Sequence, residues 1–401
     1  MGLSMEAGPS AALAAIGVAA WTVLLFARGR FWQARERLDA DEPDRATWPA
    51  VVAVVPARNE ANVIGRSIRS VVAQDYPGAF VTVLVDDHSA DGTAAVARAA
   101  AEEAGYADRL ATVASRAVPE GWAGKLWALS EGLRHARQLS PNAAFVWFTD
   151  ADIAHDAQSL RRLVGKAERE DRDLVSVMVL LSCRRFWEKL LVPPFVFFFA
   201  MLYPFAWVND RRARTAAAAG GCVLLRRAAL ERAGGLEPIR DAIIDDCALA
   251  RLIKEHGRDG PGAIWLGLSA KLASIRPYEG LAGIWWMVVR SAYTQLGRSP
   301  FLLAGTLAGL AVVYLAPPVI VLSYPSTGNT AALALAAIAW AAMSIAFRPW
   351  LRLYRQSTLL APALPVAAVL YCAMTVHSAV QHWRGRGGAW KGRLQGGRAG
   401  R

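Results

Sequence analysis

Apolar residues are distributed along the chain in three regions with different patterns. Residues 10–27, "SAALAAIGVAAWTVLLFA", form an uninterrupted apolar run that is long enough for a helix that crosses a bilayer. From about residue 49 to residue 170, short apolar runs alternate with segments of helical periodicity, and beyond residue 300 the chain is again mostly apolar. This pattern predicts a soluble middle domain between two membrane-inserted regions.

The middle region predicts a sheet with helices on both faces. The segments 50–57, 80–87, 110–115 and 144–152 are short apolar runs typical of buried strands, and helical patterns lie between them. Such alternation is typical of an α/β fold with a Rossmann-like, mostly parallel sheet. Ligands of such sheets bind beyond the carboxyl ends of the strands, so we look for the site there.

Composition supports a membrane protein. The 401 residues are 54% hydrophobic and 19% charged, with a net charge of +12, whereas soluble proteins carry about a quarter charged residues. The basic residues mostly flank apolar segments, where they set topology and meet anionic lipid, so no nucleic-acid partner is expected. The four cysteines form no CxxC motif, and they fit a reduced cytoplasmic domain without a zinc site.

The flanks of the first apolar run predict its orientation. No Lys or Arg precedes it, whereas "RGRFWQARER" follows it, which is typical of a signal anchor with a cytoplasmic C-terminal flank. Near the other end, residues 301–322 and 331–347 predict a hairpin of two spanning helices. A third run, 358–380, lies between two basic segments that both favour the cytoplasm. Either this run is re-entrant or one flank breaks the positive-inside rule.

The stretch 190–208, "LLVPPFVFFFAMLYPFAWV", has no charge and is also long enough to cross a bilayer. It lies between the acidic motifs "TDAD" and "IDD", which a single crossing would place on opposite sides of the membrane. We expect its prolines to break a straight helix, and the basic residues on both sides favour a segment in the cytoplasmic leaflet. There it would give a membrane-bound molecule access to the second acidic motif. The alternative is a buried core segment of the soluble domain.

Acidic residues follow two of the predicted strands. Asp86 and Asp87 end the second strand, and Asp150 and Asp152 follow the fourth. Carboxylates at these positions can accept hydrogen bonds from a nucleobase or from ribose hydroxyls. They can also hold Mg²⁺ or Mn²⁺ together with substrate phosphates, which stabilises the charge of a diphosphate leaving group. For Asp91, in the same region, we expect only a helix N-cap.

Two predicted helices begin with charged residues. Lys125 could bind a phosphate near a helix N-terminus, or it could be a solvated first-turn lysine. Asp245 and Asp246 begin an amphipathic helix, where a carboxylate is favourable electrostatically. Asp246 is our candidate for the general base, because a hydroxyl that attacks an anomeric carbon must lose its proton.

Together these motifs resemble the inverting nucleotide-sugar transferases of glycosyltransferase family 2, which have a GT-A fold. Over residues 48–320 the chain further resembles the hopene-associated glycosyltransferases of bacterial hopanoid gene clusters. The blocks that carry this resemblance are, in order, "VVPARNE", "QDYPG", "VDDHSADGT", "GWAGKLWAL", "TDADIAH", "PPFVFFFAMLYPFAWVND", "AAAAGGCVLLRRAALERAGG", "IDDCALARLIK", "WLGLS", "SIRPYEGL" and "RSAYTQL".

The resemblance assigns roles to the candidate residues. It implies that Asp87 binds the nucleoside beside Asp86, that Asp150 contacts ribose or metal, and that Asp152 holds Mg²⁺ or Mn²⁺ on the diphosphate. It also implies that Asp246 activates the acceptor hydroxyl. Further expected contacts are Pro56, Arg58, Glu60 and Lys125 for the nucleotide-sugar, and Asp245, Arg290 and Gln295 for the acceptor or the diphosphate.

The implied protein is a multi-pass enzyme of the bacterial inner membrane with a cytoplasmic catalytic domain. We expect it to move a sugar from a nucleotide-sugar, a UDP-sugar, to the hydroxyl of a hopanoid-like lipid acceptor. The expected regions are a signal anchor and basic juxtamembrane segment (1–47), a GT-A domain (48–299) with an interfacial segment (186–209), a transmembrane region (300–383) and a basic tail (384–401).

Two alternatives stay open. A processive polysaccharide synthase would be expected to carry (Q/R)xxRW, but the nearest string is "QLGRS", with Ser299 at the tryptophan position. A catalytically silent lipid-binding or transport protein is the other alternative. A transporter would be expected to show repeated spans with polar midplane positions, which the sequence lacks, and a silent protein could lose its acids, which the sequence keeps.

Overall fold

The computed structural model describes residues 8–258, 260, 262–387, 389–390 and 393–394. The chain divides into two compact units. The first, which we call the sheet unit, comprises Arg35–Ser182 and Phe205–Pro277 together with the described part of Gly388–Arg401. The second, the helical unit, comprises Cys183–Pro204 and Tyr278–Gly387 together with the described part of Met1–Ala34. Residues 183–204 and 278–299, expected within the GT-A region, therefore belong to the helical unit.

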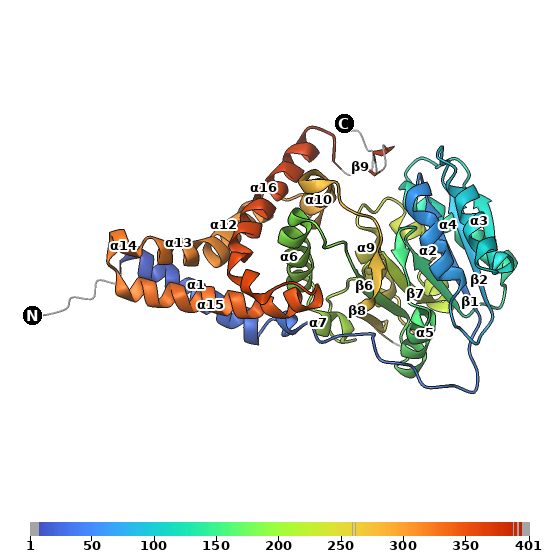
Figure 1. Cartoon of the computed structure of the whole chain (residues 1–401), viewed down its shortest axis with the longest axis horizontal. Coiled ribbons are helices and arrows are strands. Elements are labelled where there is room, and N and C mark those ends of the chain that lie inside the picture. Colours follow the sequence, from blue (N-terminus) through green and yellow to red (C-terminus); the bar gives the residue numbers. More distant parts are fainter. Residues whose placement is uncertain (1–7, 259, 261, 388, 391–392, 395–401) are drawn as a thin grey trace, which may run out of the picture. The chain divides into compact units, whose positions relative to one another are not determined.

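The main sheet has eight strands within the described residues. They are β1 (Val51–Ala57), β2 (Phe80–Asp86), β3 (Leu110–Ala114), β4 (Phe145–Thr149), β5 (Ile153–Ala154), β6 (Leu174–Leu180), β7 (Cys222–Arg226) and β8 (Ile264–Ser274), in the order β3-β2-β1-β4-β7-β6-β8-β5 (Figure 1). The neighbours β3, β2, β1 and β4 are parallel, as expected. Strand β7 is antiparallel to β4 and β6, so the sheet is mixed. The α/β fold class is confirmed.

Helices cover both faces of this sheet. Alternate residues of a strand share a face, and the alternate residues 51, 53, 55 and 57 of β1 belong to core clusters with α2, α3 and α5. On the other face, α4 approaches β1 so closely that an added Cβ at Gly132 would overlap Val54. The helices of this unit are α2 (Ala61–Val72), α3 (Thr93–Glu103), α4 (Gly124–Leu139), α5 (Ser159–Arg169), α7 (Phe205–Asn209), α8 (Arg227–Arg232) and α9 (Asp245–Glu255), with short 3₁₀ turns η2 (Ala107–Arg109) and η3 (Glu237–Ile239).

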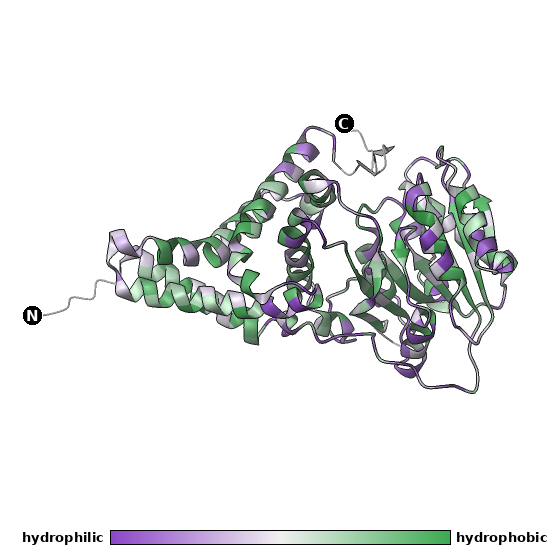
Figure 2. Cartoon of the chain, viewed as in Figure 1, coloured by the Kyte–Doolittle hydropathy of each residue, from purple (hydrophilic) through white to green (hydrophobic). Residues whose placement is uncertain are grey.

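The helical unit contains the apolar segments. Four stretches of the described residues are long and apolar enough to cross a membrane, namely Pro9–Phe26, Pro300–Leu322, Thr330–Leu353 and Thr358–Trp383, and they are mostly green or pale in Figure 2. Their elements are α1 (Pro9–Phe26), α12 (Pro300–Leu310), the π-helical η4 (Ala311–Leu315), α13 (Ala316–Leu322), α15 (Thr330–Leu353), the 3₁₀ helix η5 (Thr358–Ala363) and α16 (Leu364–Trp383). The remaining elements are η1 (Phe31–Gln33), α6 (Phe186–Leu202), α10 (Gly280–Val289), α11 (Ala292–Gln295) and α14 (Tyr324–Thr327); β9 (Ala389–Trp390) and β10 (Arg393–Leu394) pair near the C-terminus.

The apolar stretch 190–208 is divided between two helices. Helix α6 continues through Pro193 and Pro194, and it ends just before Pro204, after which α7 belongs to the sheet unit. In α6 the ring of Phe197 packs against Phe31 and Phe347 of the helical unit. The expectation that all the prolines break the helix is therefore wrong for the first pair, whereas Pro204 does separate the two helices. The interfacial position of the segment stays a prediction.

The close approach of α4 to β1 gives a stability prediction. Gly132→Ala should lower the free energy of unfolding by about 1–3 kcal/mol, because the new methyl group overpacks a fully buried strand. Thermal unfolding of the detergent-solubilised protein measures the effect. Gly65→Ala is the matched control, since its methyl group would lie 3.3 Å from Val96 and 3.7 Å from Ala100, without overlap. Equal melting temperatures for the two variants would contradict this account of the packing.

Candidate active site

The strand order brings the expected acids to one edge of the sheet. The chain goes from β1 to β2 and β3 on one side and to β4 on the other, which makes the carboxyl ends of β1 and β4 a topological switch point. Asp87 follows β2, and its backbone N–H donates to the carbonyl of Ala57 at the end of β1. Asp150 directly follows β4. These positions were expected from the sequence.

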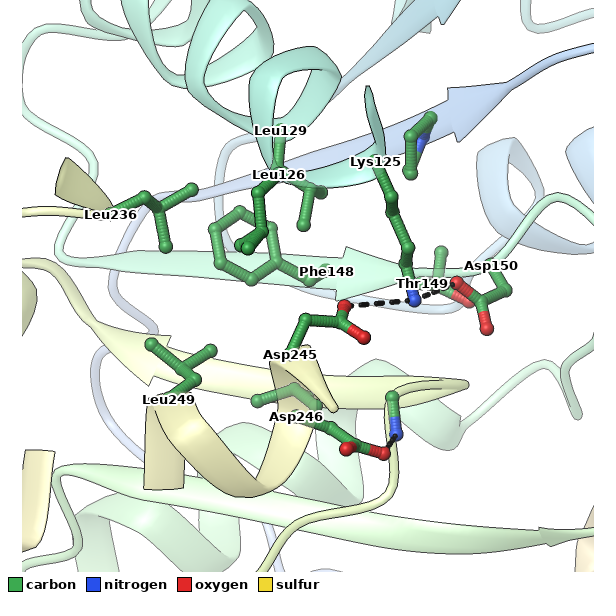
Figure 3. A pocket seen from close by; sticks show the side chains of 13 residues that line it. Lys125, Leu126, Leu129, Phe148, Thr149, Asp150, Leu236, Asp245, Asp246 and Leu249 are labelled. Carbon is green, nitrogen blue, oxygen red and sulfur yellow. Dashed lines mark hydrogen bonds and ion pairs between the residues drawn. The ribbon is translucent and has the colours of Figure 1, made fainter. Parts of the chain in front are cut away.

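Lys125 lies between two carboxylates (Figure 3). Its Nζ is 2.9 Å from Oδ1 of Asp150 and 3.2 Å from Oδ2 of Asp245, and only 18% of its side chain is exposed. Burial disfavours the ammonium, but the attraction of these carboxylates outweighs it and raises the pKa of Lys125. The interpretation as a solvated first-turn lysine is therefore wrong. The first turn of α4 instead delivers a positive charge to the acids that follow β4 and begin α9.

Asp246 is held in place by backbone donors. The N–H of Gly220 donates to its Oδ2 over 2.9 Å, and the N–H of Cys247 donates to its Oδ1 over 2.8 Å. Burial, reinforced by the neighbouring charge of Asp245, raises the pKa of Asp246 to about 6. A carboxylate with this pKa is mostly ionised at neutral pH, but it is a better proton acceptor than an ordinary aspartate.

Gly220 belongs to a loop that is itself fixed to the sheet. The preceding residue, Ala219, donates its N–H to Oγ of Ser176 in β6 over 2.8 Å. A Cβ at Gly220 would lie 3.3 Å from Nζ of Lys125 and 3.4 Å from Oδ2 of Asp246. Glycine therefore permits the backbone to donate to Asp246 at close range. The sequence analysis did not select Gly220, although the quoted block "AAAAGGCVLLRRAALERAGG" contains it.

A pocket joins these groups. It has an apolar wall that faces three carboxylates and one ammonium, as Figure 3 shows. Such a wall lowers the local dielectric constant and strengthens the electrostatic interactions of the charged groups. The lining residues are Pro56, Lys125, Leu126, Leu129, Phe148, Thr149, Asp150, Gly220, Val223, Leu236, Asp245, Asp246 and Leu249.

Asp152 has a cationic partner that sequence reasoning missed. Its Oδ2 accepts from Nε of Arg276 over 3.1 Å and from Oγ of Ser274 over 3.2 Å. Arg276 also forms an ion pair with Glu60, so it links the end of β1 to the acid expected to hold the metal. The only sequence signal for Arg276 is its place in the block "SIRPYEGL", a few residues after the last strand of the sheet.

The remaining expected donor contacts lie at the ends of β1 and β2. Nη1 of Arg58 donates to the carbonyl of Asp87 over 2.7 Å and lies 3.6 Å from its Oδ2. Oδ1 of Asp86 accepts from the N–H of Ser89 over 2.9 Å. The carboxylate of Asp91 accepts from the N–H groups that begin α2 and α3. The N-cap of α3 is Gly92, so the expectation that Asp91 is the N-cap is wrong; its carboxylate instead joins the starts of two helices.

Arg290 and Gln295 are in the helical unit, whereas the acids described above are in the sheet unit. The N–H of Arg290 ends α10 by donating to the carbonyl of Trp286, and the side-chain amide of Gln295 donates to the hydroxyl of Tyr203. Nothing in these contacts distinguishes the two residues as binding groups. Their proposed contacts with acceptor or diphosphate stay predictions.

The residues present fit a divalent cation that is shared with a substrate. The described residues contain no group of three or more His, Cys, Asp or Glu side chains that could hold a metal ion alone. Asp150 and Asp152 instead offer single carboxylates, each paired with one cationic side chain. Mg²⁺ and Mn²⁺ are commonly bound through one or two carboxylates plus substrate phosphates. The arrangement therefore favours metal binding together with a diphosphate.

Comparisons with known proteins agree with this geometry. A family model described as "Glycosyltransferase like family 2" matches residues 49–260, which is more than half of the chain. A 4,4'-diaponeurosporenoate glycosyltransferase of Staphylococcus aureus (strain MRSA252) is 30% identical over 141 residues, or 35% of this chain and 34% of that protein. The aligned region therefore spans about a third of the length of this relative.

One solved structure extends the similarity to nearly the whole chain. The mannosyltransferase PcManGT of Pyrobaculum calidifontis, in complex with GDP-Man and Mn²⁺, superposes with a TM-score of 0.53 and 22% sequence identity. The match covers 92% of this chain and 99% of that one. At this level of identity the similarity concerns the fold alone, so the roles of individual residues rest on the geometry described above.

The shared ammonium gives a pH-dependent stability prediction. Lys125→Met should destabilise the protein by about 3 kcal/mol at pH 8, because it leaves buried carboxylates without their cation. Without Lys125 the folded-state pKa of Asp150 rises further above its unfolded value, so the variant regains stability as the pH falls towards 4. Melting temperatures between pH 4 and 8 measure this. Lys125→Arg, which keeps the charge, is the control, and a pH-independent loss in Lys125→Met would contradict the electrostatic explanation.

Proposed function

Because the chain belongs to the family 2 glycosyltransferases and therefore transfers sugars from nucleotide-sugar donors, we propose that its acceptor is the hydroxyl group of a membrane lipid. One observation carries the mechanism. A partly buried carboxylate with a raised pKa, Asp246, is fixed by a backbone N–H in a pocket that also holds an ammonium group. This is the environment that a general base requires for accepting a hydroxyl proton near neutral pH.

In the proposed reaction, Asp246 takes the proton of the acceptor hydroxyl. The hydroxyl oxygen forms a bond to the anomeric carbon on the face opposite the diphosphate, and the bond between that carbon and the diphosphate oxygen breaks. The electron pair leaves with the nucleoside diphosphate, and the configuration at the anomeric carbon is inverted. Gly220 holds Oδ2 of Asp246, so the carboxylate does not have to reorient during the transfer.

The leaving diphosphate requires positive charge. Lys125 could exchange one of its carboxylate partners for a phosphate oxygen, because it lines the pocket and its Nζ lies between Asp150 and Asp245. Asp150 and Asp152 would hold Mg²⁺ or Mn²⁺, which neutralises the charge that develops on the diphosphate. The ion pair of Arg276 with Asp152 stabilises that carboxylate, and the guanidinium group of Arg276 would supply a second positive charge for the diphosphate.

The nucleoside would lie over the ends of β1 and β2. Asp87 is almost fully buried and fixed by Arg58, which makes it a rigid acceptor for a nucleobase N–H. Asp86 is half-buried beside it and would be available to ribose or base. Pro56, near the end of β1, and Glu60, at the start of α2, would complete the nucleoside site. We propose UDP as the carrier, following the resemblance of the sequence blocks, with Asp150 as the ribose or metal contact.

An apolar acceptor is supported by the membrane-type helices. Four apolar stretches indicate membrane association. A relative named for glycosyl transfer to 4,4'-diaponeurosporenoate supports an acceptor of low polarity. The hopanoid-like identity rests on the ordered sequence blocks alone. With the basic flanks on the cytoplasmic side, the enzyme would act at the inner face of a bacterial cytoplasmic membrane.

A single transfer fits better than chain elongation. Ser299, which stands where the processive synthases carry tryptophan, forms the N-cap of α12 by accepting from the N–H of Leu302. The position therefore serves helix capping and offers no aromatic platform for a growing polysaccharide. The ion-paired acids of the pocket also argue against a silent lipid-binding protein, because burying charged groups that have no function would lower the stability of the fold.

The general base gives the first functional test. Asp246→Asn should lower kcat/KM by about 10²–10⁴-fold in membranes supplied with a UDP-sugar and a lipid extract, because the amide accepts no proton. Binding of the UDP-sugar, measured separately, should change little. The matched control is Asp241→Asn, an exposed acid in the preceding loop, which should retain transfer. Unchanged transfer by Asp246→Asn would exclude this residue as the base.

The pH profile tests the environment of that base. Its raised pKa predicts that kcat/KM falls tenfold per pH unit below about pH 6, where Asp246 is protonated. In Asp245→Asn the neighbouring negative charge is gone, so the pKa of Asp246 falls and the acid limb moves to lower pH. Initial rates between pH 4.5 and 8 give both midpoints. Identical midpoints in the two proteins would mean that another group titrates.

A further inference from the structure

The final apolar segment, residues 358–383, is long enough to cross a membrane, but its two ends lie at the same end of the helical unit. We propose that this segment is re-entrant: it enters the bilayer, returns to the face from which it came, and contacts the acyl chains of one leaflet. The inference concerns the membrane surface of the protein, and it does not depend on the sugar chemistry.

The hairpin of the two preceding spans defines the ends of the unit. The first span (α12, η4 and α13) is joined to α15 by the short α14 turn, and α13 packs against α15. A connection this short makes the two spans antiparallel neighbours, as Figure 1 shows. The start of α12 and the end of α15 therefore lie at the same end, opposite the turn. We call this the base of the helical unit.

Helix α1 identifies the base as the end that connects to the sheet unit. Asn329, beside the α14 turn, hydrogen bonds to Ser10 near the start of α1. The other end of α1 is followed by Arg28, which donates to the carbonyl of Met201 in α6. Only a few residues later, at Ala34, the chain leaves the helical unit. The chain thus passes to the sheet unit from the base.

After α15 the chain turns back along the same helix. The side chain of Gln356, just beyond α15, donates to the carbonyl of Cys183. The 3₁₀ helix η5 then packs against α15, and Nε1 of Trp340 donates to the carbonyl of Pro362 over 3.0 Å. Trp340 lies about 20 Å from the end of α15, at 1.5 Å per residue. The end of η5 therefore lies at about the middle of the span formed by α15.

Helix α16 then returns to the base. Near its middle, the hydroxyl of Tyr371 donates to the carbonyl of Leu191 in α6 over 2.8 Å. Near its end, Oγ of Ser378 accepts from the N–H of Tyr293 over 3.0 Å. The ring of Tyr293 also packs against His382 and Trp383, the last residues of α16. Tyr293 lies in α11, directly before α12, so α16 ends where the first span begins.

The turn between η5 and α16 has the hydrogen bonding that irregular backbone needs inside a bilayer. Irregular backbone is tolerated at membrane depth only where protein groups satisfy its polar atoms. Here the carbonyl of Pro362 accepts from the indole of Trp340, and Pro362 itself has no N–H to satisfy. Ala361 and Leu364, on either side of the turn, are each only 1% exposed. Pro362 itself is exposed, but its carbonyl is satisfied by protein and the residues Ala361 and Leu364 anchor the turn in the helical unit.

The outer face of the segment is apolar. Side chains that would contact lipid include Leu359, which is 88% exposed, and a row of half-exposed valines along α16. This row continues the apolar surface of the candidate spans, which makes acyl chains its partner. The valines are Val366, Val369 and Val376.

The proposed path also places both basic flanks of the segment on the side that the positive-inside rule favours. The segments "FRPWLRLYRQS" and "RGRGGAWKGR" both favour the cytoplasmic side. If residues 358–383 crossed the bilayer, one of them would lie on the wrong side. With a re-entrant segment, both flanks lie on the side from which the chain reaches the sheet unit, and three spans cross.

Labelling of single cysteines in the full-length chain tests the path. In a background without the four native cysteines, we would place one cysteine at Arg386 beyond α16, at Ser326 in the α14 turn, or at Glu102 in the sheet unit, all of which are exposed. A membrane-impermeant maleimide is then added to spheroplasts or to inverted inner-membrane vesicles. Arg386→Cys should react from the same side as Glu102→Cys, and Ser326→Cys from the other. Reaction of Arg386→Cys together with Ser326→Cys would overturn the proposal.

A second measurement covers the case in which the cysteine-free protein does not fold. The otherwise unmodified chain carries an epitope tag after Arg401, and protease is added to inverted vesicles. The tag should be removed under the conditions that cleave the sheet unit, and both should be protected in spheroplasts. A tag that stays protected while the sheet unit is cleaved would overturn the re-entrant path.

Contact with acyl chains is tested by spin labels. A nitroxide on Leu359→Cys, in vesicles of phosphatidylethanolamine and phosphatidylglycerol, should be relaxed more strongly by oxygen than by a water-soluble nickel complex. A nitroxide on Arg386→Cys should show the reverse. Leu359→Cys relaxed mainly by nickel would show that the segment does not enter the leaflet.

Discussion

The ammonium group of Lys125, shared between two carboxylates, is the interaction on which the site depends. Asp150 ends a strand and Asp245 begins a helix, and each lies about 3 Å from Nζ. Two buried carboxylates this close would repel each other strongly without the cation between them. The cost of burying these charges is offset only because the geometry is good and the ion pairs are short. The cation therefore permits β4, α4 and α9 to meet at one pocket.

The backbone around this cation is arranged to keep the base rigid. Ser176 in β6 fixes the N–H of Ala219, and the next residue, Gly220, donates to Asp246. The donor thus belongs to a loop anchored on the sheet and not to a mobile side chain. Burial in the pocket, together with the negative charge of Asp245, keeps the pKa of Asp246 raised. The proposed chemistry uses both properties, because a preorganised base loses little free energy in reorientation.

Buried polar groups of the helical unit are also satisfied by hydrogen bonds, and these bonds fix the ends of its helices. Glu188 is almost completely buried, and its carboxylate accepts from the N–H groups of Arg184, Arg185 and Tyr278. It thereby fixes the start of α6 to the segment that leads into α10. The carbonyl of Pro362 is satisfied in a similar way by an indole. If the helical unit contacts lipid, as we propose, such pairings decide where irregular backbone can occur, and so where the chain can turn back.

The sequence by itself determined the elements that depend on local pattern. The parallel strands, the acids at their ends and the apolar stretches follow from periodicity and run length, and the motifs together indicated glycosyltransferase family 2, which the family model confirms. It did not determine the partner of Lys125, the roles of Gly220 and Arg276, or the return of residues 358–383. Each of these depends on groups that are far apart in the chain and meet only after folding. Local periodicity carries no information on such contacts, so only the tertiary structure decided them.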